Sequence, residues 1–311
     1  MVTTVNIMKI SLSPFLKPFL KSVSASAIAL LVFAATAMPS LAADPFRSQN
    51  ARAIGDQTQK VFELIFKEGN YKEAIKQLDV AVKAEPNEPL LFVLRASTAF
   101  AKEDYAAMQM DGKRVRANAE ALRGHDNLRA YIYIAVSDLL EAGYIFKTEG
   151  IASTGRILPL VQNVFDNLQK AKEITPDDPE LNLIKGYIDM LIASVFPLSD
   201  LETALESLKL YAAPDYLKWR GIAIAYRDAN KPDLALDAVN KALAAAPNNP
   251  ELHYLKGQLL WSQGGANIPA AKQEFETALT KADQMNAGML ADMREQCRII
   301  SGGVKCPEGN R

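Results

Sequence analysis

The sequence predicts an all-α fold in which pairs of helices repeat along the chain. The first observation is a segment that recurs as Pro-Asn-Glu-Pro at residues 86–89, Pro-Asp-Asp-Pro at 176–179 and Pro-Asn-Asn-Pro at 247–250. Each copy leads into an amphipathic stretch with a small residue seven positions after the second proline. Proline fits the first helical turn because it has no N–H to lose, and Asn and Asp turn and cap the chain. Each copy therefore predicts a turn followed by a helix.

The second observation is a spacing of Ala, a large residue and Ala at positions i, i+4 and i+7, which places all three on one helix face. The small residues would let a neighbouring helix approach closely, and the large residue would fill the groove between them. The spacing occurs as Ala74, Leu78 and Ala81, as Ala235, Val239 and Ala242, and as Ala271, Phe275 and Ala278. It predicts the second helix of a pair.

The order of the expected elements follows from these two patterns. We expect helix pairs at 55–88, 89–122, 126–178 and 179–213, two longer pairs with extended internal turns at 227–233 and 263–269, and a closing helix at 287–300. The third pair is oversized, with a first helix through Phe146, and the fourth has an extended turn at 196–200. One pair cannot bury its own apolar face, so stacking of the pairs across 53–300 would create the core. Residues 44–52 are expected to be a linker and 301–311 a tail.

Residues 1–43 have the features of a secretory signal peptide. Lys9, Lys17 and Lys21 precede an apolar stretch at 25–38, and small residues follow it. That stretch is short for a membrane span, which needs about 20 residues. We expect cleavage after Ala42 or Ala43, and the alternative is an uncleaved anchor. No later stretch is apolar enough for stable membrane insertion. Because a secretory signal peptide directs export, we expect the product to be extracytoplasmic, with the periplasm as the first choice.

Composition and motifs argue against several other classes. The chain has 35 Lys and Arg against 36 Asp and Glu, a formal net charge of −1, which gives no electrostatic reason to expect a nucleic-acid partner. Two His and two Cys are little material for a metal site. No phosphate-binding loop, dinucleotide fingerprint, nucleophile elbow or zinc-protease motif occurs. We therefore expect no catalytic residues, no metal and no cofactor. An enzyme or its regulatory subunit and an RNA-reading repeat are the weaker alternatives.

The alternation of helices resembles the tetratricopeptide repeat family, whose unit is a helix-turn-helix of about 34 residues. Residues 55–88 fit that frame in length, with Gly69, Tyr71 and Pro86 at family positions, whereas Phe62 stands where a small residue is expected. The resemblance implies a right-handed α-solenoid of about six helix hairpins with a C-terminal capping helix. The whole chain is also similar to exported cyanobacterial repeat proteins of unassigned function, which would make the thylakoid lumen the alternative compartment.

The same resemblance implies a concave face built by the first helix of each hairpin. The partner-binding candidates among its positions are Phe66, Phe100, Tyr187, Lys218, Tyr254, Gln258 and Trp261. The other positions carried over to this chain are Gln59, Glu63, Val93, Ser97, Leu183, Met190 and Ile222. Rigid aromatic side chains there would suit binding hot spots. The alternative for each ring is packing in the core or on an adjacent helix. The Lys, Asn and Arg clamp with which some members grip a C-terminal carboxylate is absent.

Cys297 and Cys306 enclose eight residues that include Gly302 and Gly303. In an oxidising compartment we expect them to form a disulfide that ties the tail to the last helix, and a redox-active pair is the alternative.

The predicted function is that of an exported, non-enzymatic scaffold that binds an extracytoplasmic protein or peptide on its concave face. The alternative is a carrier or assembly factor that holds an apolar ligand in a pocket of the oversized third pair, lined by Tyr131, Tyr133, Tyr144 and Phe146.

Overall fold

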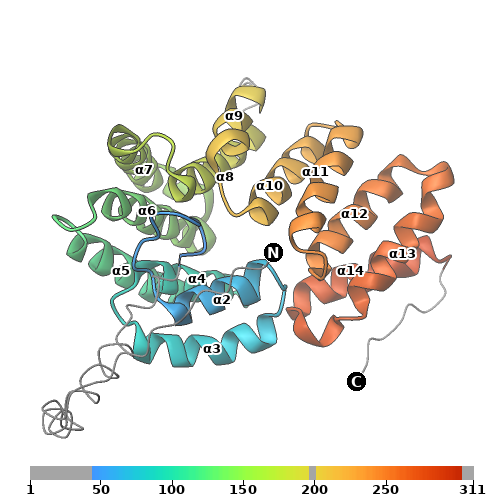
Figure 1. Ribbon diagram of the computed structural model, residues 1–311, viewed down its shortest axis with the longest axis horizontal. Coiled ribbons are helices and arrows are strands. Elements are labelled where there is room, and N and C mark those ends of the chain that lie inside the picture. The colour runs from blue at the N-terminus through green and yellow to red at the C-terminus, as the bar shows by residue number, and fades with distance from the viewer. Residues whose placement is uncertain (1–43, 196–200, 303–311) are drawn as a thin grey trace, which may run out of the picture. The chain divides into compact units, whose positions relative to one another are not determined.

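The computed structural model describes residues 44–195 and 201–302, and all regular secondary structure in these two ranges is helical (Figure 1). The α-helices are α2 (Asp56–Phe66), α3 (Tyr71–Ala84), α4 (Pro89–Ala101), α5 (Tyr105–Ala121), α6 (Asn127–Glu149), α7 (Thr154–Ile174), α8 (Pro179–Val195), α9 (Leu201–Tyr211), α10 (Asp215–Asp228), α11 (Pro232–Ala245), α12 (Pro250–Gln263), α13 (Ile268–Leu279) and α14 (Ala287–Ile300). Short 3₁₀ segments, η3 (Gly150–Ser153), η4 (Gly265–Asn267) and η5 (Ala282–Gln284), lie in three of the connections.

The helices pack as hairpins in chain order. The pairs in contact are α2 with α3, α4 with α5, α6 with α7, α8 with α9, α10 with α11 and α12 with α13, and α14 packs on α13. The predicted all-α fold of six helix hairpins with a closing helix is therefore confirmed for the described residues. The predicted extended turn at 196–200 lies outside them, as does most of the predicted tail.

Small residues allow the two helices of a hairpin to approach closely. A Cβ atom on Gly186 of α8 would lie 2.6 Å from the Leu208 side chain of α9, and one on Gly257 of α12 would lie 2.6 Å from the Phe275 ring of α13. The residues of the Ala, large, Ala spacing are all buried in the second helices. The spacing predicted from the sequence thus marks the packed faces of α3, α11 and α13.

Proline and Asn begin the first helices as expected. Pro89, Pro179 and Pro250 are the first residues of α4, α8 and α12. Asn249 caps α12, because its Oδ1 accepts from the backbone N–H groups of Glu251 and Leu252. A side-chain acceptor at this position satisfies N–H groups that have no partner inside the helix.

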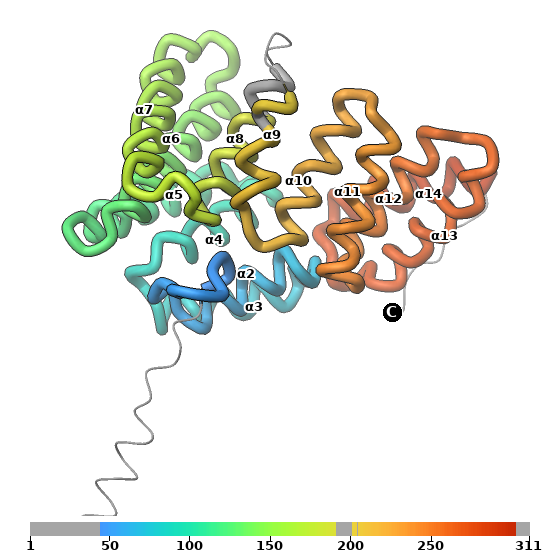
Figure 2. Tube along the Cα trace, turned by 45° about the horizontal axis from the view of Figure 1, so that its top comes forward, coloured from blue at the N-terminus to red at the C-terminus, as the bar shows by residue number. Residues whose placement is uncertain are grey.

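The first and last hairpins are in contact, so the row of hairpins returns to its beginning (Figure 2). Asn249 is fully buried, and its Nδ2 donates to the carbonyl of Phe66 at the end of α2, at 2.9 Å. Gly69 of the α2–α3 turn has φ +63°, and a Cβ there would lie 2.9 Å from Pro250 Cδ. The two hairpins are about 180 residues apart in sequence, so these contacts hold the N-terminal and C-terminal parts of the repeat together.

Residues 44–54, which include the predicted linker, pack against the hairpins. Phe46 and Ile54 are buried in the main hydrophobic core, which extends through α12. The Phe46 ring meets the Phe62 ring of α2 edge to face, with centroids 5.1 Å apart. We call residues 44–54 the N-terminal strap. Among the described residues, no helix combines the length and the apolar character that crossing a membrane requires.

Candidate functional site

An apolar cavity of about 370 Å³ lies on the inner face of the helix pairs and is partly open to solvent. Its walls come from the N-terminal strap and from the first helices of the first five hairpins. The lining residues are Phe46 of the strap, Phe62 and Phe66 of α2, Leu90, Val93, Leu94 and Ser97 of α4, Tyr133, Val136 and Leu139 of α6, Leu183, Ile184, Tyr187 and Ile188 of α8, and Leu217 and Arg220 of α10. Its volume lies within the usual range of ligand pockets, about 300–1,000 Å³.

The repeat itself explains why these side chains converge. In each hairpin the second helix covers one side of the first, so a different side of the first helix is left to face inward. Five such helices placed next to one another supply five apolar stripes to one concave surface. The cavity is therefore a property of the stacked array, and one hairpin alone could not form it.

Most polar groups in the cavity wall are satisfied by the protein itself. The Tyr187 hydroxyl donates to the backbone carbonyl of Leu217 at 2.8 Å, and Ser97 Oγ donates to the carbonyl of Leu94 at 2.7 Å. The Tyr133 hydroxyl donates to the carboxylate of Glu180. Burial raises the pKa of Tyr187 to about 12, so the phenol stays neutral at physiological pH. Because the three hydroxyls already donate to protein groups, the cavity is chemically apolar.

Arg220 of α10 is the one charged residue in the described cavity wall. Its Nη2 lies 2.6 Å from Oε2 of Glu251 in the first turn of α12, and its side chain keeps 24% exposure. Oε1 of Glu251 accepts from the Tyr71 hydroxyl of α3 at 2.5 Å. The nearby Glu251 carboxylate raises the pKa of Arg220, so the guanidinium remains charged. The Tyr71–Glu251–Arg220 chain thus links the contact of the first and last hairpins to the cavity wall.

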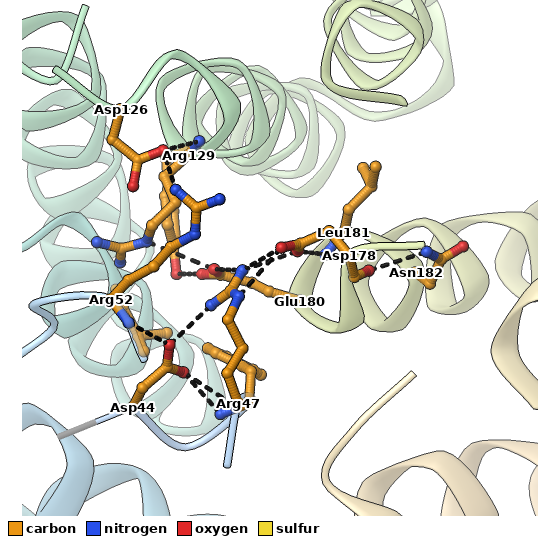
Figure 3. Close-up of polar contacts among 12 residues, drawn as sticks. Asp44, Arg47, Arg52, Asp126, Arg129, Asp178, Glu180, Leu181 and Asn182 are labelled. Carbon is orange, nitrogen blue, oxygen red and sulfur yellow. Dashed lines mark hydrogen bonds and ion pairs between the residues drawn. The ribbon is translucent and has the colours of Figure 1, made fainter. Parts of the chain in front are cut away.

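A second polar network fixes the N-terminal strap beside the cavity (Figure 3). Arg47 donates from Nε to Asp178 at 3.0 Å, from Nη2 to Glu180 at 2.9 Å and from Nη1 to Asp44 at 3.0 Å. The side chains of all four residues are almost completely buried. Burial lowers the pKa of Arg47, but the surrounding carboxylates have the larger combined effect and hold this pKa well above its ordinary value. The network anchors the strap, and the strap holds the ring of Phe46 in the cavity wall.

Arg129 of α6 extends this network deeper into the fold. Its Nη2 donates to Oε1 of Glu88 at 2.5 Å, and its Nε lies 3.4 Å from Oε2 of Glu180. Burial is the main influence on Glu88 and raises its pKa, although the Arg129 guanidinium opposes this. Glu88 precedes α4, Arg129 lies in the first turn of α6 and Glu180 lies in the first turn of α8, so the network ties three hairpins together.

The structure brings two of the seven predicted partner-binding residues into this site. Phe66 and Tyr187 line the cavity. Phe100 is exposed and packs on Tyr105, with ring centroids 6.2 Å apart. Lys218 pairs with Asp215 at 2.6 Å. Of the other positions expected on the concave face, Val93, Ser97 and Leu183 line the cavity. Gln59, Glu63, Met190 and Ile222 do not line it.

The remaining three candidates belong to the last hairpin and lie elsewhere. Tyr254 and Trp261 pack on the Phe275 ring, with centroids 5.8 and 6.4 Å away, in a second core cluster with α13 and α14. Gln258 donates to Gln296 of α14 at 3.2 Å. The presence of the closing helix explains this placement, because α14 occupies the side of the hairpin that these residues face.

Only part of the pocket predicted for the third pair belongs to the observed cavity. Of its four aromatic residues, Tyr133 lines the cavity, whereas Tyr131, Tyr144 and Phe146 do not. Sequence reasoning missed the contributions of Phe46, Val136, Leu139 and Arg220. Phe46 lies in the segment expected to be a linker. Arg220 has the same repeat position as three other basic residues. Those three, Arg95, Lys185 and Lys256, pair with acidic side chains outside the cavity wall.

The described residues contain no cluster of three or more His, Cys, Asp or Glu side chains arranged to hold a metal ion. Cys297 is buried in α14, and Cys306 lies outside the described residues. The disulfide between them stays a prediction.

Paired helices with an inner face made by the first helix of each pair define an α-helical repeat protein. The tetratricopeptide repeat family model matches residues 220–286, a segment that runs from within α10 to Asn286, the residue before α14. The resemblance predicted from the sequence is confirmed there. No curated protein matches the chain.

Two solved structures are similar to the chain at low identity. A crystal structure of a thermophilic tetratricopeptide repeat protein from Thermus thermophilus is 17% identical, covers 78% of this chain and 98% of that chain, and has a TM-score of 0.29. The crystal structure of the APC/C hetero-tetramer Cut9-Hcn1 is 15% identical, covers 78% of this chain and 48% of that chain, and has a TM-score of 0.36. Sequence identities and TM-scores this low carry no conclusion about function.

Proposed function

We propose that the chain is a non-catalytic scaffold that receives an apolar part of a protein partner in the cavity on its inner face. Tetratricopeptide repeats are typically protein-binding scaffolds, and residues 220–286 match the model of this family. The observation that carries the proposal is the convergence of five first helices on one apolar cavity. An apolar side chain that enters such a cavity gains about 25 cal/mol for each Å² of apolar surface that it removes from water, and the entropy lost on association offsets part of this gain.

Filling the cavity tests this function. Val93→Trp would place a large ring in the cavity, whereas Val80→Trp adds the same ring at an exposed position of α3 that does not line it. Both proteins are checked for helix content and melting temperature and then used to recover partners by crosslinking from the extracytoplasmic fraction. We expect Val93→Trp to lose a partner that the wild type and Val80→Trp both recover. Equal recovery by all three proteins would contradict docking in the cavity.

Export belongs to the same proposal. Residues 1–43 would act as a cleaved signal peptide and deliver the protein to the periplasm, or to the thylakoid lumen of a cyanobacterium. The basic residues at the start of segment 1–43, its short apolar stretch and the small residues before Asp44 support the assignment as a signal peptide. Fractionation and N-terminal sequencing of the native protein test it, and a cytoplasmic protein that retains residues 1–43 would contradict it. Peptide mapping without reduction tests the disulfide of Cys297 with Cys306 in the same sample.

A second candidate function is that of a carrier or assembly factor that holds a small apolar ligand. The observation that favours it is the nearly complete absence of free polar groups from the described wall of a cavity of ligand size. In this function the cavity lies across five first helices, rather than in the third pair alone as the sequence predicted. The following inference concerns the chemistry of such a ligand.

A further inference from the structure

The position of the single charge in the cavity wall restricts what can bind there. A long apolar chain fits the walls, since a cavity of about 370 Å³ has room for about a dozen water-sized groups. The hydroxyls of Tyr187 and Ser97 already donate to backbone carbonyls. A ligand group that needs hydrogen bonds therefore has one place to find donors in the described wall, at Arg220.

The guanidinium of Arg220 has donors to offer. It carries five N–H groups in a planar fork, and its polar partner among the described residues is Glu251, which is 2.6 Å from Nη2. The side chain also lines the cavity and keeps part of its surface accessible. A group inside the cavity can thus accept a hydrogen bond from Arg220 without breaking the ion pair to Glu251.

The charge balance decides which acceptor fits best. Glu251 is 4% exposed and already neutralises Arg220. A second carboxylate beside this pair would leave an excess negative charge against apolar walls, where an uncompensated ion is costly. An uncharged acceptor, such as an ester, ketone or alcohol oxygen, gains the hydrogen bond without that cost.

We propose that the cavity binds an uncharged amphiphile, a single apolar chain that ends in one neutral oxygen acceptor placed at Arg220. The apolar chain lies against α4, α6 and α8, and the Tyr71–Glu251 contact holds the guanidinium in place. This inference rests on the second candidate function, because it names the ligand class of the same cavity.

A matched series of three probes tests the proposal on the purified full-length chain. Decane, methyl decanoate and decanoate share a chain of ten carbons and differ in the end group. Each is titrated against bound N-phenyl-1-naphthylamine at about pH 8, where decanoate is ionised. We expect methyl decanoate to displace the dye at about tenfold lower concentration than decane, as one hydrogen bond from a charged donor implies. Decanoate should bind no more tightly than the ester.

A double substitution assigns the preference to Arg220. Arg220→Met with Glu251→Gln removes both charges together, so it leaves no buried ion unpaired. We expect it to lose the preference for methyl decanoate, so that decane and methyl decanoate displace the dye at the same concentration. The matched control, Arg298→Met with Glu295→Gln, removes an exposed ion pair of α14 and should keep the preference. If the Arg220 and Glu251 double variant does not fold, Arg220→Lys, which keeps a donor and the charge, should retain a reduced preference.

Other results overturn the inference in distinguishable ways. Tighter binding of decanoate than of the ester would indicate an anion site. Equal binding of decane and methyl decanoate would show that Arg220 gives no hydrogen bond to the ligand. If none of the three probes displaces the dye while Val93→Trp still loses a protein partner, the cavity is a docking site for protein and the ligand inference fails alone.

Discussion

Tyr71 of α3 and Glu251 of α12 are 180 residues apart in sequence, and the Tyr71 hydroxyl donates to the Glu251 carboxylate at 2.5 Å. The same carboxylate holds Arg220 in the cavity wall. The contact between the first and last hairpins and the candidate binding site therefore share one residue. A substitution that disturbs the contact is expected to affect both stability and binding.

Asn249→Ala tests the contact of the first and last hairpins through a helix cap. Asn249 accepts from two N–H groups of α12 and also donates to the carbonyl of Phe66. Loss of a cap typically costs about 1 kcal/mol, and the buried carbonyl left without its donor adds about 1–3 kcal/mol. Asn286→Ala is the control, because Asn286 caps α14 through Met289 N–H alone among the described contacts. Urea unfolding should show the larger loss for Asn249→Ala, and equal losses would contradict the prediction.

Gly69→Ala tests the same contact sterically. Gly69 and Gly124 both have positive φ, at +63° and +83°, so an Ala at either position costs about 1–2 kcal/mol of backbone strain. A Cβ at Gly124 meets nothing within 4 Å, whereas one at Gly69 lies 2.9 Å from Pro250 Cδ. We expect Gly69→Ala to lower the free energy of unfolding more than Gly124→Ala, by roughly a further 1 kcal/mol. The two losses would be the same if α12 did not lie against this turn.

Arg47→Met tests the anchoring of the N-terminal strap. The substitution would leave the buried carboxylates of Asp178 and Glu180 without their shared partner, and breaking one side of a buried pair typically costs about 3–5 kcal/mol. Arg298→Met removes an exposed pair on α14 and should cost less than about 1 kcal/mol. Thermal unfolding of both variants measures the difference. Similar melting temperatures for the two variants would show that the strap is not held by Arg47.

His253 gives a pH dependence whose sign follows from its pKa. A hydrogen bond with Glu274 is the main influence and raises the pKa of His253 above its ordinary value of 6.5, and the carbonyl of Pro247 also accepts from the ring. Because the folded pKa is the higher one, the imidazolium contributes its full stability below the unfolded pKa. This contribution is lost as the pH rises through the folded pKa.

We therefore expect His253→Gln to be less stable than the wild type at about pH 5.5 by up to about 1 kcal/mol, with a smaller difference at about pH 9. Urea unfolding at both pH values measures it. The exposed His125 supplies the control variant His125→Gln. A His253→Gln difference that grows with pH would have the wrong sign for this account.

Much of the fold could be predicted because each hairpin repeats one local pattern. Two features show this: the prolines that begin α4, α8 and α12, and the buried Ala74, Leu78 and Ala81 of α3. Their structural roles depend only on contacts within a hairpin or with the next one. Periodicity in the sequence reports such local contacts directly.

The contact between the first and last hairpins could not be predicted in this way. Asn249 looks like an ordinary helix cap and Gly69 like an ordinary turn residue, and their second role depends on the curvature accumulated over six hairpins. The same curvature determines which side chains reach the cavity. Phe66 and Tyr187 lie in the part of the array that surrounds it, whereas Tyr254 and Trp261 are covered by α13 and α14.

Photo-crosslinking from Ser97 tests the central claim most directly. Ser97 lies in the cavity wall and is exposed, so p-benzoylphenylalanine at this position would lie next to any bound partner. We predict a crosslinked product from position 97 that disappears in the Val93→Trp background and persists in the Val80→Trp background, with no such product from a probe at Val80. A product that forms equally from both probe positions, or that survives Val93→Trp, would show that the inner cavity is not where this protein binds.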